Sequence, residues 1–465
     1  MITYVSTFLD YVMYFFIAYL IGYASFQIIS VIVGAYELNS SKRLQYLRGV
    51  LSENAYIPVS ILVPAHNEGM TVCDTVYSLL NLDYSLFEIV VVNDGSTDDT
   101  AESLIKEFNL IETRRPIRIQ LPCKDVVSVY ETKVGRINLT LINKVNGGKA
   151  DALNMGINAS RFPYFVCMDA DSLLQKDSIY RIVQPILTDS NVVAVGGSVR
   201  PCNDSIIEKG VVKKIKIPKN LIAAMQVIEY DRTFLATRIL FDKFNGSMII
   251  SGAFGLFKKD IVIQAGGYNA GTVGEDMELV LRLHEYCAVN QTSYRIKYAT
   301  DAICWTQAPE KLSDLCKQRR RWHLGLRQSM ASHRRLFASQ EFGLLSVISY
   351  TYFLLYELYT PVIEMFGLFT VILAYCFELL NVRYMIFFTL FYTLYGVVIS
   401  NTAFFSRTQT TDLEANLFDH VRAFFISILE IIFLRPVLSF VRMRALFSNI
   451  NNTKWGKIQR KKFTK

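Results

Sequence analysis

Two short runs of sequence, VSILVP at residues 59–64 and EIVVV at residues 88–92, decide the fold of this chain. Each run is apolar and mostly β-branched, which is typical of a strand buried on both faces. Residues 71–82 between them have a helical pattern, and the small and acidic residues 96–99 begin another helix. Because parallel strands need crossover helices, this β-α-β-α order predicts a parallel sheet.

Further strands and helices are predicted in the next hundred residues. Alternating apolar and polar residues at 117–145 predict short added strands, and residues 149–159 predict a helix that leads into a strand at 164–168. Residues 191–199 form another β-rich run. The lysine-rich residues 200–220 are expected to be an exposed loop rather than a binding patch.

The two ends of the chain are more apolar than its middle. The 465 residues are 51% hydrophobic, and the mean hydropathy of +0.26 is high for a soluble protein. Residues 8–33 carry one charge, Asp10, and are long enough to cross a hydrocarbon core of ~30 Å. Because this run is longer than a signal peptide needs, we expect an uncleaved anchor. Lys42, Arg43 and Arg48 follow it, so the next domain is predicted to be cytoplasmic.

A second apolar region lies after residue 341. Residues 342–380, interrupted by Pro361, favour an interfacial helix running into one span, with two spans as the alternative. Residues 384–405 predict another span, whereas the charges within residues 417–434 make that segment ambiguous. The basic tail is expected to be cytoplasmic, so two or four spans are expected between the catalytic domain and the tail.

Charge and cysteine usage narrow the class of partners. The net charge of +8 comes without a nucleic-acid-binding module, and much of it lies in the tail and beside membrane segments. Anionic membrane lipid accounts for such charge, so we expect lipid and no nucleic acid as a partner. The eight cysteines have no paired C-x-x-C spacing, which favours thiols over disulfides or a zinc site.

Carboxylates stand at the ends of the predicted strands, where an α/β sheet presents side chains to a ligand. Asp169 and Asp171 suit Mg²⁺ or Mn²⁺, because hard cations prefer carboxylate oxygens and still share diphosphate oxygens. Asp94 could accept hydrogen bonds from a base or ribose. A capped turn is the alternative for each of these sites.

Other polar motifs follow the same logic. The sequence AHNE at residues 65–68 follows the first strand, and NGGK at 146–149 joins a flexible glycine turn to a cation at a helix start, which suits phosphate but lacks P-loop spacing. Asp276, beside Glu275, is the candidate general base, although both acids could merely complement a helix N-terminus. The sequence QRRRW at 318–322 offers arginine for diphosphate and an indole for a sugar, or a basic interfacial helix.

The order and spacing of these motifs resemble the membrane-integrated, inverting family-2 glycosyltransferases. That family includes cellulose, hyaluronan, chitin, poly-N-acetylglucosamine and mixed-linkage β-glucan synthases, and the resemblance covers roughly residues 59–322. It implies an α/β glycosyltransferase A-type domain with a mixed, mainly parallel sheet, joined to an α-helical transmembrane region with interfacial helices. The residues that make up these motifs are most similar to those of bacterial glucan synthases.

The resemblance also implies roles for individual residues. Nucleotide binding is implied for Ala65, Asn67, Glu68, Asp94, Lys149, Asp151, Asp169, Gln318 and Arg321; metal binding for Asp169 and Asp171; acceptor binding for Ser251, Gly252 and Trp322; and catalysis for Asp276 as the base, with Glu275 beside it. Mg²⁺ or Mn²⁺ is the implied cofactor.

The implied organisation has six parts. They are an N-terminal transmembrane helix at 1–40, a linker at 41–58, a cytoplasmic catalytic domain at 59–308, an interfacial region with the QRRRW sequence at 309–341, transmembrane and interfacial helices at 342–446, and a basic cytoplasmic tail at 447–465. A multi-pass protein of the bacterial plasma membrane is therefore expected.

The implied function is processive synthesis of a β-linked polysaccharide and its export through the chain's own helices. UDP-glucose and a β-glucan, of mixed β-1,3 and β-1,4 linkage in one form, are expected first. A poly-N-acetylglucosamine, chitin-like or hyaluronan synthase using UDP-N-acetylglucosamine is the alternative, followed by a non-processive lipid-carrier transferase and an inactive membrane scaffold. Accessory export subunits are possible partners.

Two departures from the family pattern are visible. The base motif reads Gly274-Glu275-Asp276 where cellulose-type members usually have Thr-Glu-Asp, which puts acceptor placement in question. We expect no cyclic-di-GMP-binding domain after the membrane part. Instead, the tail with Trp455 and Arg460 loosely resembles the gating loop of hyaluronan synthases, and a juxtamembrane basic tail is the alternative.

Overall fold

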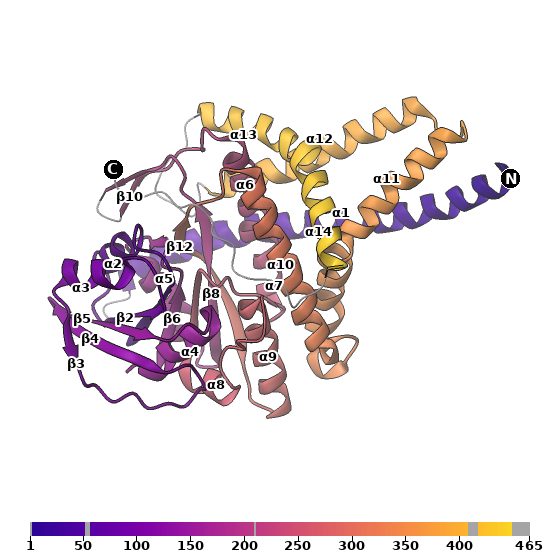
Figure 1. Cartoon of the computed structure of the whole chain (residues 1–465). Helices are drawn as coiled ribbons and strands as arrows, with labels where there is room; N and C mark the ends of the chain where they lie inside the picture. Colours follow the sequence, from indigo (N-terminus) through magenta and orange to yellow (C-terminus); the bar gives the residue numbers. More distant parts are fainter. Residues whose placement is uncertain (1, 52–55, 209–210, 408–416, 449–465) are drawn as a thin grey trace.

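A ten-stranded mixed sheet organises the middle of the chain in the computed structural model, which describes residues 2–51, 56–208, 211–407 and 417–448 (Figure 1). In order across the sheet, the strands are β3 (Ile111–Thr113), β4 (Val126–Val134), β5 (Ile137–Lys144), β2 (Phe87–Asp94), β1 (Val59–Ala65), β6 (Tyr164–Met168), β11 (Phe254–Lys258), β8 (Val192–Pro201), β12 (Arg295–Thr306) and β7 (Ser172–Leu174).

The centre of this sheet is parallel, as predicted. Strands β5, β2, β1 and β6 pair in parallel, and helices α2 (Val72–Leu80), α3 (Thr100–Phe108) and α4 (Lys149–Ala159) connect them. The register sets Ala65 beside Asn93 and Asp94 beside Lys144. The carboxyl ends of these strands therefore meet at one edge, where the loops with the predicted site residues begin.

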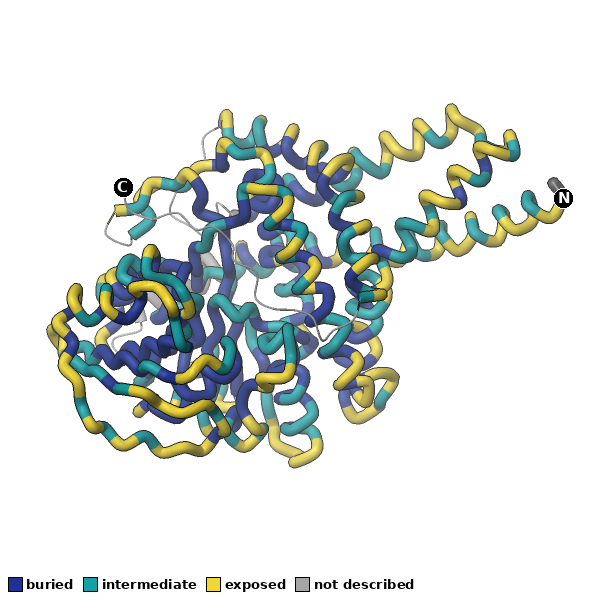
Figure 2. Tube along the Cα trace, in the orientation of Figure 1, coloured by how far each residue is buried: buried dark blue, intermediate teal, exposed yellow. Residues whose placement is uncertain are grey.

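Helices cover both faces of the sheet, so its strands are buried on both sides. Along β1, Ile61 and Val63 belong to the core under α2, α3 and α5 (Ser178–Thr188), whereas Leu62 belongs to the core under α4 and α9 (Glu275–Val289). Each fully buried apolar side chain of this size contributes roughly 1.5–3 kcal/mol. Figure 2 shows this buried interior beside the exposed, projecting helices.

The segment expected to be an exposed loop at 200–220 is partly ordered as a hairpin. Strands β9 (Ile206–Glu208) and β10 (Val211–Lys214) pair antiparallel, and Arg200 is buried at the end of β8. The hairpin forms because Ile207 and Val212 pack against the cluster around Trp305. Lysines on its other side stay exposed, which gave the segment its loop-like composition.

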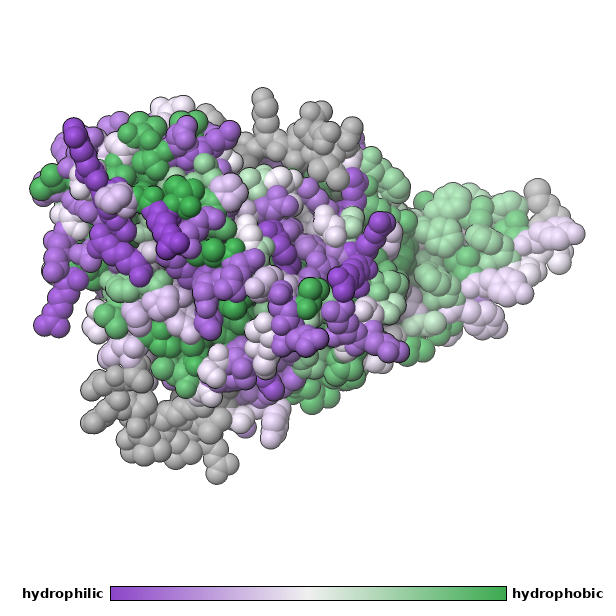
Figure 3. Space-filling model, turned by 90° about the horizontal axis from the view of Figure 1, so that it is seen from below, coloured by the Kyte–Doolittle hydropathy of each residue, from purple (hydrophilic) through white to green (hydrophobic). Residues whose placement is uncertain are grey.

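Long apolar helices project from the sheet domain. Helix α1 (Ile2–Leu51) continues through part of the segment expected to be a linker. Within the described part of the chain, three helical stretches are long and apolar enough to cross a membrane: Thr3–Ser40, Val382–Ser406 and Phe418–Leu446. Large apolar side chains such as Tyr384 and Phe387 are 74% and 73% exposed on the second of them. Figure 3 shows the hydrophobic surface gathered on the projecting end, which is the pattern of a surface that faces lipid.

The apolar region around Pro361 is broken, as the sequence indicated. Leu345–Leu358 and helix α11 (Thr360–Cys376) meet at an angle of 48°, with the proline in the first turn of α11. Proline suits that position because its missing N–H would be unpaired there anyway. After the sheet domain the described residues hold two candidate spans, or three if the bent pair is one span.

The charges that made residues 417–434 ambiguous all contact protein. Helix α13 (Leu417–Leu429) carries Arg422, which donates to the carbonyl oxygens of Ile217 and Pro218. Glu430 lies 3.2 Å from Arg232. Arg435, at the start of α14 (Arg435–Leu446), donates to the Tyr392 hydroxyl at 3.2 Å. Their cost in lipid is reduced because each of these side chains is paired within the protein.

Candidate active site

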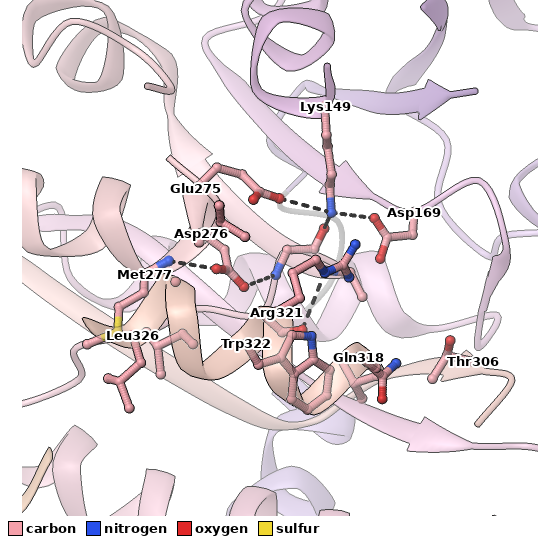
Figure 4. A pocket seen from close by; sticks show the side chains of 18 of the residues that line it. Lys149, Asp169, Glu275, Asp276, Met277, Thr306, Gln318, Arg321, Trp322 and Leu326 are labelled. Carbon is pink, nitrogen blue, oxygen red and sulfur yellow. Dashed lines mark hydrogen bonds and ion pairs between the residues drawn. The ribbon is translucent and has the colours of Figure 1, made fainter. Parts of the chain in front are cut away.

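One cavity of about 1030 Å³ gathers almost all of the residues that the sequence singled out (Figure 4). It lies at the carboxyl ends of β1, β2 and β6 and reaches helix α10 (Leu312–Ser332). The predicted residues that line it are Ala65, Asn67, Glu68, Asp94, Lys149, Asp169, Asp171, Ser251, Gly252, Glu275, Asp276, Gln318, Arg321 and Trp322.

Asp94 holds the glycine turn at the start of α4. Its Oδ1 accepts hydrogen bonds from the amide of Gly147 at 2.9 Å and from Lys144 Nζ at 2.5 Å, and its Oδ2 accepts from the amide of Gly148 at 2.7 Å. Gly148 has φ +89°, which a residue with a side chain rarely adopts. Asp94 therefore fixes the turn that sets Lys149 in the cavity, whereas the N-cap position of the following helix, α3, is occupied by Asp99.

Asp151 has a different place from the one expected beside the diphosphate. It is buried, it is not among the residues that line the cavity, and its carboxylate lies 2.6 Å from Lys144 Nζ. It also accepts from the amide of Lys124. Lys144 was missed in the sequence, although a lysine that ends an apolar strand among acidic loops was the available signal.

Lys149 is the centre of charge in the cavity. Its Nζ lies 2.5 Å from Asp169 Oδ1 and 3.4 Å from Glu275 Oε1, and it donates to the carbonyl oxygen of Gly252 at 3.2 Å (Figure 4). Burial alone would lower the pKa of Lys149, but Asp169 and Glu275 outweigh burial and raise it above its usual range. The ammonium group is therefore charged at all physiological pH values.

The two acids at the start of α9 face different partners. Burial raises the pKa of the Glu275 carboxyl group, Lys149 opposes that shift, and Asp276 adds to it. Asp276 Oδ1 accepts from the amide of Met277 at 2.8 Å, and its Oδ2 accepts from the amide of Gly252 at 3.1 Å. Asp276 thus binds an amide in the first turn of its own helix and also points at the loop that is expected to border the acceptor.

Helix α10 presents the QRRRW residues to the same cavity. Trp322 is 42% exposed, and the guanidinium of Arg319 lies 4.3 Å from the centre of its ring. Arg319 is itself held by Glu229 at 2.6 Å. The indole is therefore held by a cation on the preceding turn while it lines the cavity. Arg319 is part of the QRRRW sequence but was given no role of its own there, and Glu229 was not singled out.

Comparison with known proteins decides the family. Residues 57–325, more than half of the chain, match the family model described as glycosyltransferase like family 2. The chain belongs to this family. The resemblance to family-2 glycosyltransferases is thereby confirmed, whereas the likeness to a glucan synthase in particular stays a prediction.

Relatives of this family-2 glycosyltransferase include poly-beta-1,6-N-acetyl-D-glucosamine synthases. The chain is 28% identical to one from Staphylococcus aureus (strain COL) over 313 residues, which is 67% of this chain and 65% of that protein. It is 30% identical to one from Staphylococcus epidermidis over 310 residues, 66% of this chain and 64% of the relative. The matched part thus spans less than two thirds of the length of these relatives.

A solved structure confirms the fold. The chain is similar to a mannosyltransferase from Pyrobaculum calidifontis in complex with GDP-mannose and Mn²⁺, with a TM-score of 0.53 and 19% identity over 83% of this chain and 98% of the other. The predicted glycosyltransferase A-type fold, with its mixed sheet, is therefore correct.

The residues of this family-2 glycosyltransferase fit a divalent cation that shares its ligands with a substrate. Asp169 and Asp171 both line the cavity and supply hard carboxylate oxygens. Among the described residues, no group of three or more His, Cys, Asp or Glu side chains is placed to hold a metal alone. A cation here would take its remaining ligands from diphosphate and water, and it would neutralise charge on the leaving diphosphate.

The far end of the cavity leads away from the sheet toward the apolar helices. There it is lined by Arg238, Tyr352, Phe353, Glu357 and Arg442. The guanidinium of Arg238 lies 4.2 Å from the centre of the Phe234 ring, and its Nε and Nη1 have no hydrogen-bond partner. No sequence motif pointed to these residues, because they come from separate helices that only the fold brings together.

The remaining predicted site residues, Trp455 and Arg460 of the possible gating loop, lie outside the residues that the structure describes.

Proposed function

We propose that this family-2 glycosyltransferase is a processive, inverting enzyme that builds a β-linked polysaccharide from a UDP-sugar. The observation that carries the proposal is the continuity of one cavity, from Asp169 and Asp171 past Asp276 and Trp322 to the apolar helices. An enzyme that adds one sugar and then releases its product needs only the part of this cavity from Asp169 and Asp171 to Trp322. The continuation toward the helices supports a product that stays bound and leaves through the membrane.

The chemistry follows from the charges in the cavity. Asp276 takes the proton of an acceptor hydroxyl, the acceptor oxygen forms a bond to the anomeric carbon, and the bond from that carbon to UDP breaks. The electron pair and negative charge leave with the diphosphate, toward Lys149 and Arg321. Attack opposite the leaving group inverts the anomeric centre, so an α-linked donor yields a β-linked product.

UDP-N-acetylglucosamine is the proposed first donor. The names of the Staphylococcus relatives support N-acetylglucosamine, although at 28–30% identity and over only part of their length. UDP-glucose and a β-glucan, which the residues of the motifs suggested first, are the alternative donor and product. Several residues of the far cavity carry hydroxyl, carboxylate or guanidinium groups that can hydrogen-bond either sugar.

We place the enzyme in the plasma membrane, with its sheet domain on the cytoplasmic side. The candidate spans and the exposed apolar side chains of the projecting helices support membrane insertion. The basic residues after the first span support this orientation. UDP-sugars are made in the cytoplasm, which agrees with a cavity on that side.

The deciding experiment supplies purified protein, in lipid nanodiscs with Mg²⁺ or Mn²⁺, with single UDP-sugars. UDP release and product size are measured, and the product is digested with linkage-specific glucanases, chitinase, hyaluronidase or a β-hexosaminidase. A long polymer from UDP-N-acetylglucosamine supports the proposal. If polymer formed from UDP-glucose alone, the donor would be UDP-glucose and the product a glucan, as the sequence first suggested. A single-sugar lipid product would refute processivity.

A further inference from the structure

We propose that Gln328 of α10 is a positioning residue, which fixes the candidate base Asp276 relative to Trp322, and that the contact between Gly274 and Gly325 sets their spacing. The inference rests on the proposed function only in naming Asp276 as the base. The residues involved are the loop at 266–276, which leads into α9, and the helices that hold this loop.

Gln328 binds the backbone of the loop with both ends of its amide. Its Nε2 donates to the carbonyl oxygen of Gly271 at 2.9 Å, and its Oε1 accepts from the amide of Val273 at 3.1 Å. These bonds hold the loop just before Glu275 and Asp276. Gln328 lies six residues after Trp322 on the same helix, so a rigid element of about 9 Å joins the sugar platform to the base loop.

Two glycines allow the loop and α10 to touch backbone to backbone. A Cβ atom on Gly274 would lie 2.9 Å from Gly325 Cα, and one on Gly325 would lie 2.8 Å from Gly274 Cα. Both distances are too short for carbon atoms, and backbone cannot rotate away as a side chain can. The glycine that departs from the usual Thr-Glu-Asp motif therefore sits where α10 leaves no room for a side chain.

The other end of the loop is held by α4, the helix that begins with Lys149. Asn154 donates to the carbonyl oxygen of Tyr268 at 2.9 Å and accepts from the amide of Tyr268 at 2.8 Å. Arg282 of α9 donates to the carbonyl oxygen of Gly267 at 2.8 Å. The base loop is thus tied to the helix that carries the diphosphate-side lysine and to the helix that carries the sugar platform.

This arrangement matters because general-base catalysis is sensitive to placement. A displacement of about 1 Å can cost roughly 10²-fold in rate. Gln328 is not itself among the residues that line the cavity; its contact with the lining is the hydrogen bond from the Val273 amide. Its loss is therefore expected to lower kcat and to leave the donor contacts of Gln318 and Arg321 intact.

The test compares Gln328→Met, which keeps the side-chain length and removes both hydrogen bonds, with Gln328→Glu, which keeps the acceptor for Val273. Ser332→Ala, at an exposed position on the last turn of α10, is the matched control. Three quantities are measured: kcat and KM for the UDP-sugar, UDP affinity by calorimetry, and deuterium exchange of the amides at 269–277.

For Gln328→Met we expect faster exchange at 269–277 and a fall in kcat of about tenfold or more, with KM and UDP affinity within about twofold of wild type. For Gln328→Glu, the exchange rate at 269–277 and kcat are both expected to lie between the values for Gln328→Met and for wild type. Gly325→Ala, which moves the loop and α10 apart, is expected to lower kcat in the same way.

Unchanged exchange in Gln328→Met would show that Gln328 does not hold the loop. Faster exchange with unchanged kcat would show that Gln328 has no positioning role in catalysis. A fall in UDP affinity as large as the fall in kcat would show a general loss of structure instead. If wild type transferred no sugar from any donor, the proposed function would fail, and exchange at 269–277 would still decide whether Gln328 holds the loop.

Discussion

In the proposed mechanism, the chemistry of the cavity depends on Asp276 and Lys149. Asp276 points its carboxylate at the Ser251–Gly252 loop. Lys149 lies between Asp169 and Glu275, and its positive charge offsets the repulsion between these two carboxylates. Like charges this close would otherwise favour protonation of one carboxyl group. Each residue can therefore be removed with a different expected result.

Asp276→Asn is expected to lower sugar transfer by about 10²-fold or more, because an amide cannot accept the acceptor proton. UDP affinity should stay near wild type, since Asp276 contacts the Gly252 amide rather than the diphosphate side of the cavity. UDP release and calorimetry measure the two effects. Asp83→Asn, at an exposed position far along the chain, is the control, and polymer synthesis at the wild-type rate would remove Asp276 from the mechanism.

Lys149→Met is expected to weaken UDP binding by about tenfold or more, because a charge-assisted contact to diphosphate is worth roughly 1.5–3 kcal/mol. It also leaves Asp169 and Glu275 without their shared cation. Calorimetry with UDP and with uridine separates the diphosphate contact from the base contact. Lys133→Met, at an exposed strand position, is the control, and equal loss of affinity for uridine would contradict this role.

At the scale of elements, the sequence predicted what local patterns determine. Strands β1, β2 and β6 and helix α4 were expected within a few residues of where they lie, because buried strands and helices leave an apolar period. Asp169, Asp171 and Asp276 were expected at strand ends and a helix start, and they line one cavity.

The elements that were missed depend on contacts between distant residues. The Asp94–Lys144 pair joins residues fifty positions apart, and the hydrogen bond between Gln328 and Val273 joins residues fifty-five positions apart. The β9–β10 hairpin depends on the cluster around Trp305. None of these leaves a periodic signal, and Asp151 was assigned to the diphosphate because its partner Lys144 was not visible in the sequence.

Helices α9 and α10 are joined by a buried histidine whose charge should make stability depend on pH. His333 contacts Glu278 at 3.3 Å and Glu285 at 2.8 Å, and Glu278 is also paired with Arg282. Burial alone would lower the pKa of His333, but its hydrogen bonds to Glu278 and Glu285 outweigh burial and raise it from 6.5 to about 9.

The folded protein therefore keeps a proton that the unfolded chain releases above pH 6.5. Stability from this group is fully present below pH 6.5 and is lost as the pH rises through about 9, by on the order of 3 kcal/mol. Thermal unfolding between pH 6 and 10 measures it. His333→Gln should flatten the fall between pH 6.5 and 9, and equal slopes for both proteins would contradict the assignment.

At the scale of the whole molecule, buried ion pairs and backbone contacts join the catalytic domain to the apolar helices. Arg232 of α6 (Leu221–Arg232) pairs with Glu430, and Arg327 of α10 donates to the carbonyl oxygen of Leu446. The catalytic domain and the last candidate span are therefore one packed unit in the described residues.

Glu430→Gln is expected to lower stability by about 3–5 kcal/mol, because it leaves the guanidinium of Arg232 buried without a counter-charge. The double variant Arg232→Met with Glu430→Met should recover much of the loss, since neither charge is then left unpaired. Thermal unfolding in nanodiscs measures both. Glu341→Gln, in the exposed pair with Arg335, is the control and should change little.

The turn between α11 and α12 (Val382–Arg407) is expected on the outer side of the membrane, opposite the catalytic domain. A cysteine at Asn381, in a Cys376→Ser background, should react with an impermeant maleimide in intact cells. Ser332→Cys on α10 should react only after the cells are permeabilised. Labelling of both sites under the same condition would refute the proposed orientation.

The close approach of Gly274 and Gly325 also has a consequence for how the sequence can evolve. Because the two positions share one van der Waals space, a side chain gained at one is tolerated only while the other stays glycine and α10 shifts outward. The pair should therefore vary together among relatives, with a side chain at no more than one of the two positions. A lineage that changed the acceptor geometry of this cavity would be expected to record the change at these two sites, fifty-one residues apart in the chain.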